Sequence, residues 1–324
     1  MPTHMPHFPD LLFEPAARLR AWEHALMGLL AEGGYAELHP SLVMREPLEP
    51  EAVRFFDGAD LVALRWDFTV ALARLLSTRF DAPPPRISYA GAVFRRPQQP
   101  WEPVERFEVG CERLQAPGED TAAADVELAR LMVAMPAALG LKGGILQLGH
   151  AALLRRPMEA EGLDAETTAR VVRALHRRAA HRVREALDGH PAAARLAAHA
   201  EALLAEPDGP STLRALGASP YAAMLEEEIA HLGRAHAAVA PLLPPGLELR
   251  LDPADVQGIG FYTGPTLRLW APGAQAELAS GGRYDGLYPE LGRDWKAAGF
   301  CLRLSRLLDL AETRPELFAG EGLR

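Results

Sequence analysis

The sequence predicts an α+β protein in which an antiparallel sheet flanked by helices is interrupted by a helical module. Strand-like runs alternate with helices over roughly the first 150 residues, and strand-like runs return after residue 245. Between Pro157 and Pro245 the sequence is rich in alanine and has helical periodicity. We therefore expect a core in two parts, residues 1–156 and 246–324, with residues 157–245 as a helical insertion.

The first part of the core is expected to begin with a helix from Pro15 to Gly33, because proline is favoured in a first helical turn and glycine ends helices. Apolar and alternating runs then predict strands, and longer helix-period runs predict helices. The expected strands are Tyr35–Val43, Leu61–Arg65, Arg86–Arg95, Glu105–Leu114 and Gly144–Leu148. The expected helices are Thr69–Thr78 and Thr121–Leu139.

Glycine and proline divide the insertion into several helices, with breaks at Gly189, Glu206–Pro210, Gly217 and Pro244. In the second part of the core, strands are predicted again. They cover Gly246–Leu251, Phe261–Trp270 and Gln275–Ala279, and a last strand and helix run from Ala297 to Ala311.

The composition is that of an ordinary globular protein. Its 324 residues are 48% hydrophobic, which is enough for a large core. The chain has neither an apolar run of ~18 residues nor a basic and then apolar start, so we expect a cytoplasmic protein without a membrane span. Cys111 and Cys301 lie singly in apolar runs, which favours core thiols over a disulfide or a zinc site.

The net charge of −9 argues against broad electrostatic attraction to nucleic acid. The densest basic stretch falls in one predicted helix. It contains Arg170, Arg173, His176, Arg177, Arg178, His181, Arg182 and Arg184. At 3.6 residues per turn these side chains spread around much of the helix, so a solvated helix with intrahelical pairs and a partner-binding face both stay open.

Three stretches carry residues suited to a small charged ligand: Ser88–Arg96 followed by Arg106–Glu112, Gly258–Gly264 followed by Ser280–Leu287, and Ala298–Leu307. In the first, a strand, a loop and a returning strand place Arg95 and Glu112 on one sheet face. Arg95 and Arg306 present planar charged groups that suit phosphates. Gly281 and Gly282 let a backbone approach a small ligand closely.

In this order the three stretches resemble the class II aminoacyl-tRNA synthetase signatures as they occur in histidyl-tRNA synthetases. Pro40 stands at the motif 1 position, and the resemblance covers nearly the whole chain. It implies a class II synthetase-like antiparallel sheet with flanking helices, and a homodimer formed through the segment around Pro40. It also implies that Arg95 and Arg306 are what remains of a nucleotide site.

Several residues depart from the synthetase pattern. Gln257 stands where the family has a catalytic arginine that stabilises charge, Pro97 replaces a glutamate, and Arg303 replaces a glycine near the nucleotide, where its bulk would fill the adenine pocket. We expect no catalytic residues and little or no amino-acid activation. Only eighteen residues follow Arg306, which leaves no room for an anticodon-binding domain, so tRNA is not an expected partner.

The stretch Leu64–Thr69, followed by Ala73 and Arg74, resembles the form found in the regulatory subunits of short-form ATP phosphoribosyltransferases. The resemblance implies a histidine site made by Asp67, Thr69, Glu108, Glu112, Tyr262, Gly281 and Gly282. Glu108 replaces a family glutamine and adds a third acid beside Asp67 and Glu112. Since like charges repel, an empty pocket would be electrostatically unfavourable and a cationic ligand would relieve it.

These observations predict a non-catalytic regulatory subunit that associates with a short catalytic chain, the enzyme that condenses ATP with phosphoribosyl pyrophosphate. Histidine is the expected effector, and no cofactor or metal is expected. The alternatives are a truncated histidyl-tRNA synthetase paralogue with residual amino-acid activation or another role, and a structural dimer with a vestigial pocket. The spacing of Gly258, Gly260 and Gly264 does not fit a dinucleotide site, and the paired histidines, five residues apart, miss the spacing of a helical metal site.

Overall fold

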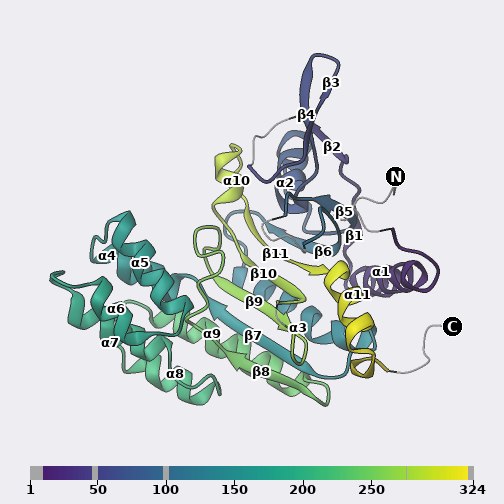
Figure 1. Cartoon of the computed structure of the whole chain (residues 1–324). Helices are drawn as coiled ribbons and strands as arrows, with labels where there is room; N and C mark the ends of the chain where they lie inside the picture. The colour runs from purple at the N-terminus through teal and green to yellow at the C-terminus, as the bar shows by residue number, and fades with distance from the viewer. Residues whose placement is uncertain (1–9, 46–49, 98–101, 275, 320–324) are drawn as a thin grey trace, which may run out of the picture.

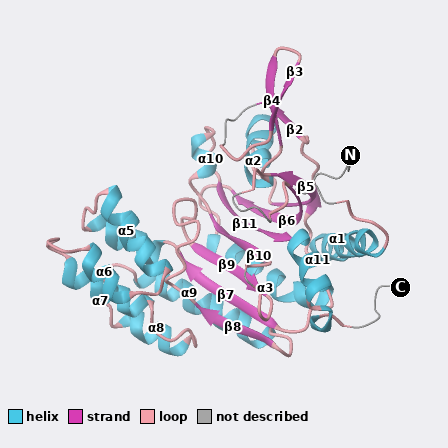
Figure 2. Ribbon diagram, viewed as in Figure 1, coloured by secondary structure: helices cyan, strands magenta, loops and turns pink. Residues whose placement is uncertain are grey.

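The computed structural model describes residues 10–45, 50–97, 102–274 and 276–319. These residues form an eight-stranded sheet, a three-stranded sheet and flanking helices (Figures 1 and 2). The large sheet has the strand order β1-β5-β6-β11-β10-β9-β7-β8. Its strands are β1 (Ala36–Glu37), β5 (Arg86–Phe94), β6 (Glu105–Gln115), β7 (Gly144–His150), β8 (Leu247–Leu251), β9 (Pro265–Trp270), β10 (Ala279–Arg283) and β11 (Lys296–Arg303).

Neighbouring strands of the large sheet run antiparallel from β5 through to β7, which confirms the predicted antiparallel sheet. The two edges differ, because β1 pairs with β5 and β8 pairs with β7 in parallel. Parallel neighbours need a long crossover connection. The chain provides one at each edge: helix α2 and the small sheet lie between β1 and β5, and the helical insertion lies between β7 and β8.

Helices cover both faces of the large sheet (Figure 1). On one face lie α1 (Glu14–Glu32), α3 (Thr121–Ala138), α9 (Glu226–Val239) and α11 (Leu304–Thr313), which share the main apolar core. On the other face lie α2 (Phe68–Arg79) and α10 (Leu287–Glu290), which share a second core.

Side chains alternate between the two faces along each strand. In β6, Val109 and Cys111 enter the main core, whereas Glu108 and Glu112 lie on the α2 side. The sheet therefore presents two buried carboxylates to the face on which α2 begins.

The small sheet has the order β2-β4-β3, with β2 (Val43–Arg45), β3 (Arg54–Asp57) and β4 (Asp60–Leu64). Strand β4 confirms the strand predicted near Leu61. The strand predicted over Tyr35–Val43 is wrong, because β1 and β2 belong to different sheets. Pro40 lies between them and has no N–H for a strand ladder, so the chain leaves the large sheet there.

The insertion consists of helices between β7 and β8. They are α4 (Ala152–Ala160), α5 (Ala165–His176), α6 (Ala180–Ala186), α7 (Ala193–Leu203), α8 (Pro210–Gly217) and α9. Because the main core runs without a break from the sheet into these helices, the boundaries at 157 and 245 stay a prediction. None of the helices in the described ranges combines the length and apolar character that a membrane crossing requires.

The basic stretch forms two helices rather than the single predicted one, because the chain turns between α5 and α6, where Arg178 has a positive φ of 53°. Arg178 pairs with Asp252, and Arg184 pairs with Glu201. The other arginines of this stretch line a surface hollow of about 270 Å³; they are Arg170, Arg173, Arg177 and Arg182.

Two strands near the C-terminal end are shifted from their predicted positions. Strand β9 begins at Pro265 rather than Phe261, because Gly258 has a φ of 73° and its carbonyl accepts the Tyr262 N–H in a turn. Strand β10 covers Ala279–Arg283, and the predicted start at Gln275 lies outside the described residues. Gly281 and Gly282 therefore belong to this strand.

Candidate functional site

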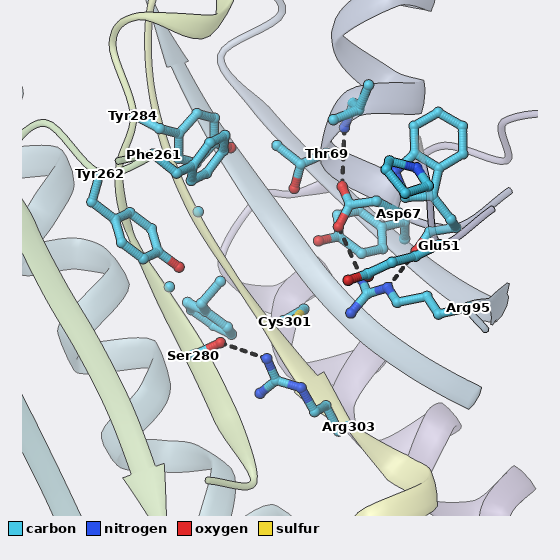
Figure 3. A pocket seen from close by; sticks show the side chains of 17 residues that line it. Glu51, Asp67, Thr69, Arg95, Phe261, Tyr262, Ser280, Tyr284, Cys301 and Arg303 are labelled. Carbon is cyan, nitrogen blue, oxygen red and sulfur yellow. Dashed lines mark hydrogen bonds and ion pairs between the residues drawn. The ribbon is translucent and has the colours of Figure 1, made fainter. Parts of the chain in front are cut away.

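A cavity of about 500 Å³ lies on the α2 side of the large sheet (Figure 3). Its walls come from the start of α2, from strands β5, β10 and β11, and from the loop before β9. Five of the predicted site residues line it: Asp67, Thr69, Arg95, Tyr262 and Gly281. Four others do not: Glu108, Glu112, Gly282 and Arg306.

The start of α2 positions Asp67 and Thr69. Asp67 is the N-cap of the helix, and its Oδ1 accepts the Val70 N–H at 3.1 Å, an interaction that stabilises a helix start. Its other oxygen accepts from Arg95 Nη2 at 3.1 Å. One turn of helix thus fixes a carboxylate and a hydroxyl at the cavity wall.

Glu112 lies beneath the cavity and is held by hydroxyl groups. Its Oε1 accepts from Thr69 Oγ1 at 2.7 Å and from the Tyr89 hydroxyl at 3.4 Å, and its Oε2 accepts from the Tyr284 hydroxyl. Burial raises the pKa of Glu112 well above the ordinary carboxyl value, although the hydrogen bond from Thr69 acts in the opposite direction. Gly299 stands opposite Glu112 on β11, and a Cβ there would overlap the carboxylate.

Arg95 lies between two of the three predicted acids. It donates to the Trp66 carbonyl at 2.6 Å and to Asp67, and its Nη2 is 3.8 Å from Glu108 Oε1. Burial opposes the charge of Arg95, but Glu108 and Asp67 outweigh it and raise the pKa of the guanidinium. Arg95, which the sequence assigns to a former nucleotide site, therefore partly offsets the repulsion expected among the acids. Glu108 is buried, and its Oε1 makes no hydrogen bond to any described residue.

A cluster of arginines surrounds Glu277 at another side of the cavity. Arg303 Nη1 is 3.3 Å from Glu277 Oε1, Arg306 Nη1 is 3.4 Å from it, and Arg268 Nη1 is 3.9 Å from it. Arg303 lines the cavity and donates to Ser280 Oγ at 2.8 Å, as Figure 3 shows. Arg306 instead donates to the Glu277 carbonyl at 2.7 Å, so its part in a nucleotide site stays a prediction.

Aromatic side chains form a further part of the wall. The rings of Phe261 and Tyr284 stack with centroids 4.9 Å apart, and Tyr262 lies beside them (Figure 3). Gly282 makes room for Tyr262, since a Cβ on Gly282 would lie 2.8 Å from that ring.

Sequence reasoning missed three residues of this site: Tyr89, Tyr284 and Ser280. Tyrosine in a strand is common in cores, so Tyr89 carried no special signal. Two clues were available in the sequence. Tyr89 follows Ile87 by two residues and therefore lies on the same face of the strand, and Tyr284 follows Arg283 directly after the glycines.

Of the residues that depart from the synthetase pattern, Gln257 lies outside the cavity, whereas Arg303 lines it and stands opposite Glu108 on β11. Gln257 is exposed and does not line the cavity, and its carbonyl accepts from Arg268 Nη2 at 2.9 Å. Within the described ranges, no three His, Cys, Asp or Glu side chains are grouped so that they could hold a metal ion. The cavity therefore presents carboxylates and hydroxyls in one part and a guanidinium in another, an arrangement suited to binding a small charged molecule.

Comparisons with known proteins identify the relatives of this chain. The family model described as histidyl-tRNA synthetase matches residues 7–307. The ATP phosphoribosyltransferase regulatory subunit of Symbiobacterium thermophilum is 33% identical, over 97% of this chain and 81% of that protein. Of solved structures, an ATP phosphoribosyltransferase regulatory subunit/histidyl-tRNA synthetase from Bacillus halodurans matches with a TM-score of 0.81 at 21% identity, covering 99% of this chain and 84% of that one.

A chain in the ATP phosphoribosyl transferase complex of Thermotoga maritima matches with a TM-score of 0.70 at 14% identity, covering 90% of this chain and 98% of that one. At these identities the two structures show a shared fold. The family model and the relative at 33% identity also show the family to which the chain belongs. The chain belongs to the histidyl-tRNA synthetase-like family of ATP phosphoribosyltransferase regulatory subunits.

Proposed function

We propose that this chain is the non-catalytic regulatory subunit of a short-form ATP phosphoribosyltransferase and that it acts with a separate catalytic chain at the first step of histidine biosynthesis. The names of its relatives and the complex that contains a structural neighbour support this role. In this role the chain activates its catalytic partner and transmits feedback inhibition by histidine.

The histidine site is proposed at the cavity, with Asp67, Thr69, Glu108, Glu112, Tyr262, Gly281 and Gly282. The observation that carries this assignment is the buried Glu112 carboxylate, reached from the cavity through the hydroxyls of Thr69 and Tyr284. A ligand ammonium near Asp67 and an imidazole N–H directed at the Glu112 group would pair with these acceptors. Carboxylates are the natural partners of both donors.

Loss of amino-acid activation is part of the proposal. Gln257 provides no charge, Pro97 replaces an acid, and Arg303 takes up space at the cavity wall. Histidine-dependent exchange of pyrophosphate into ATP should therefore be negligible. Robust exchange would favour the alternative, a truncated synthetase paralogue.

The decisive experiment mixes this chain with a purified short catalytic chain and follows the condensation of ATP with phosphoribosyl pyrophosphate. We expect the catalytic chain to be more active in the mixture than alone, and histidine to lower that activity. A catalytic chain that is unaffected by this protein would contradict the proposal.

We further propose a homodimer formed through the segment around Pro40. Leu42 and Val43, which follow it, are 43% and 42% exposed, as expected for apolar side chains that a second copy would cover. Sedimentation should show a dimer at micromolar concentration, and a stable monomer would contradict this part of the proposal.

A further inference from the structure

The two charged parts of the cavity carry opposite imbalances. Around Arg95, the carboxylates of Asp67 and Glu108 both lie within ion-pair distance of one guanidinium, so carboxylates predominate among these ion pairs. Around Glu277, the excess has the other sign. In the ion pairs of the described residues, Arg268, Arg303 and Arg306 share two carboxylates, those of Glu277 and of Asp255, which accepts from Arg268 at 2.5 Å.

The positive excess is shielded from water. The Arg268 side chain is 5% exposed and the Arg303 side chain 15% exposed. Arg303 and the partly exposed Arg306 repel one another, and this repulsion adds to desolvation in lowering the pKa of Arg306. The Nη1 atom of Arg303 is buried and makes no hydrogen bond to any described residue, so it can still donate to an anion in the cavity.

Arg303 is the member of this cluster that reaches the ligand cavity. Arg268 and Arg306 do not line it, and the other cavity arginine, Arg95, is already bound to Asp67 and to the Trp66 carbonyl. Gln257 is uncharged and therefore provides no alternative cation for a ligand. Strand β11 also places Arg303 directly opposite Glu108, so the cation lies near the acidic part of the site.

We propose that the cavity recognises a zwitterionic amino acid and that Arg303 binds its α-carboxylate while the acidic part binds its ammonium group. This inference rests on the proposed histidine site and adds the residue that distinguishes an amino acid from an amine. Arg303 therefore has a positive role in ligand selection, besides taking up space in a former nucleotide pocket. A guanidinium suits a carboxylate because it can donate two parallel hydrogen bonds.

The test compares histidine with histamine, which has the same imidazole and ammonium groups but lacks the carboxylate. Calorimetry on the full chain should show that histidine binds about 10- to 100-fold more tightly, the range for a hydrogen bond to a charged group. In Arg303→Met, histidine affinity should fall to within about 3-fold of histamine affinity, while histamine binding stays unchanged or tightens. Arg303→Lys should keep part of the preference.

The Met variant should still fold, because Glu277 keeps Arg268 and Arg306 as partners. Arg250→Gln is the matched control, since it removes an exposed arginine from the pair with Glu248 on β8. Thermal unfolding of each variant checks the fold, and the Lys variant carries the test if the Met variant does not fold.

The outcomes separate this inference from the proposed function. If the wild-type chain binds neither compound, the histidine site itself is wrong. If it binds histidine but Arg303→Met keeps the preference over histamine, the histidine site stands and the role of Arg303 is overturned. If ATP or inorganic pyrophosphate displaces histidine from the wild-type chain but not from Arg303→Met, the anion that Arg303 binds is a phosphate, and the carboxylate assignment is also overturned.

Discussion

Two networks of buried charge lie on opposite faces of the large sheet, and they differ in how completely their groups are paired. On the α3 face, Arg283 donates to both oxygens of Asp125 at 2.7 and 3.0 Å, and to Asp285 at 3.0 Å. It also donates to the Gln115 side chain at 3.1 Å and to the Thr121 carbonyl at 3.0 Å.

On the cavity face, the pairing is incomplete. Glu108 Oε1 and Arg303 Nη1 are buried and make no hydrogen bond within the described part of the chain, although each lies within ion-pair distance of a partner. A buried charge whose donors are all used serves structure, whereas one with unused capacity can serve a ligand. The comparison therefore assigns Arg283 to the fold and Arg303 to binding.

The largest expected effect tests the structural network. Arg283→Met leaves the buried Asp125 without its guanidinium partner and with His231 Nε2 3.4 Å away, and this should lower the free energy of unfolding by about 3 to 5 kcal/mol. Urea unfolding followed by circular dichroism measures the loss. Arg250→Met, at an exposed position, is the control. A loss as small as that of the control would mean that Asp125 finds other partners, and the contrast between the two faces would fail.

Arg283 also shows what the sequence could not reveal. It stands in the glycine-containing stretch Ser280–Leu287, one of those that resemble the synthetase signatures, yet it points away from the cavity because side chains alternate along β10. The glycines do not indicate which side chains share a face, and only the pairing of β10 with β9 and β11 defines this. The order of the motifs was enough to predict the fold, because the fold depends on the order of the strands along the chain rather than on their register.

The second prediction concerns the cavity face. Glu112→Gln replaces the buried acceptor with an amide of the same shape, and histidine affinity should fall by about 1.5 to 3 kcal/mol, the range for hydrogen bonds to charged groups. The fold and the activation of the catalytic partner should be largely kept. Calorimetry and the mixed-complex assay measure the two properties, with Glu227→Gln on the surface of α9 as control. If histidine inhibits the complexes of the wild-type chain and of Glu112→Gln equally, the inhibitory site lies elsewhere.

The predicted acids lie on one side of the sheet, but the sequence does not show that Arg95 contacts two of them. Arg95 came from the motif that resembles a nucleotide site, and its contact with Asp67 depends on how the α2 start meets the end of β5. Such a meeting of distant segments leaves no periodic pattern in the sequence. The tyrosines that hold Glu112 were missed for the same reason.

A smaller effect should appear in the pH dependence of stability. Since burial raises the pKa of Glu112, the folded chain holds this proton more tightly than the unfolded chain. That contribution is fully present below the ordinary carboxyl pKa and is lost as the pH rises through the raised value. Wild-type stability should therefore fall relative to Glu112→Gln over this interval, by at most about 1.4 kcal/mol per pH unit. Parallel curves for the two proteins in urea unfolding would show that Glu112 is ionised throughout.

The smallest expected effect isolates burial as the variable. Arg45 and Asp60 join β2 to β4 with an Nη2 to Oδ2 distance of 2.8 Å, which is shorter than the 3.1 Å between Arg95 and Asp67. Their side chains are 82% and 57% exposed, so water and salt screen the pair and either group is well solvated alone. Arg45→Ala should change the free energy of unfolding by less than about 0.5 kcal/mol and leave histidine binding unchanged. A loss comparable to that of Arg283→Met would show that contact distance, rather than shielding from water, determines the strength of these pairs.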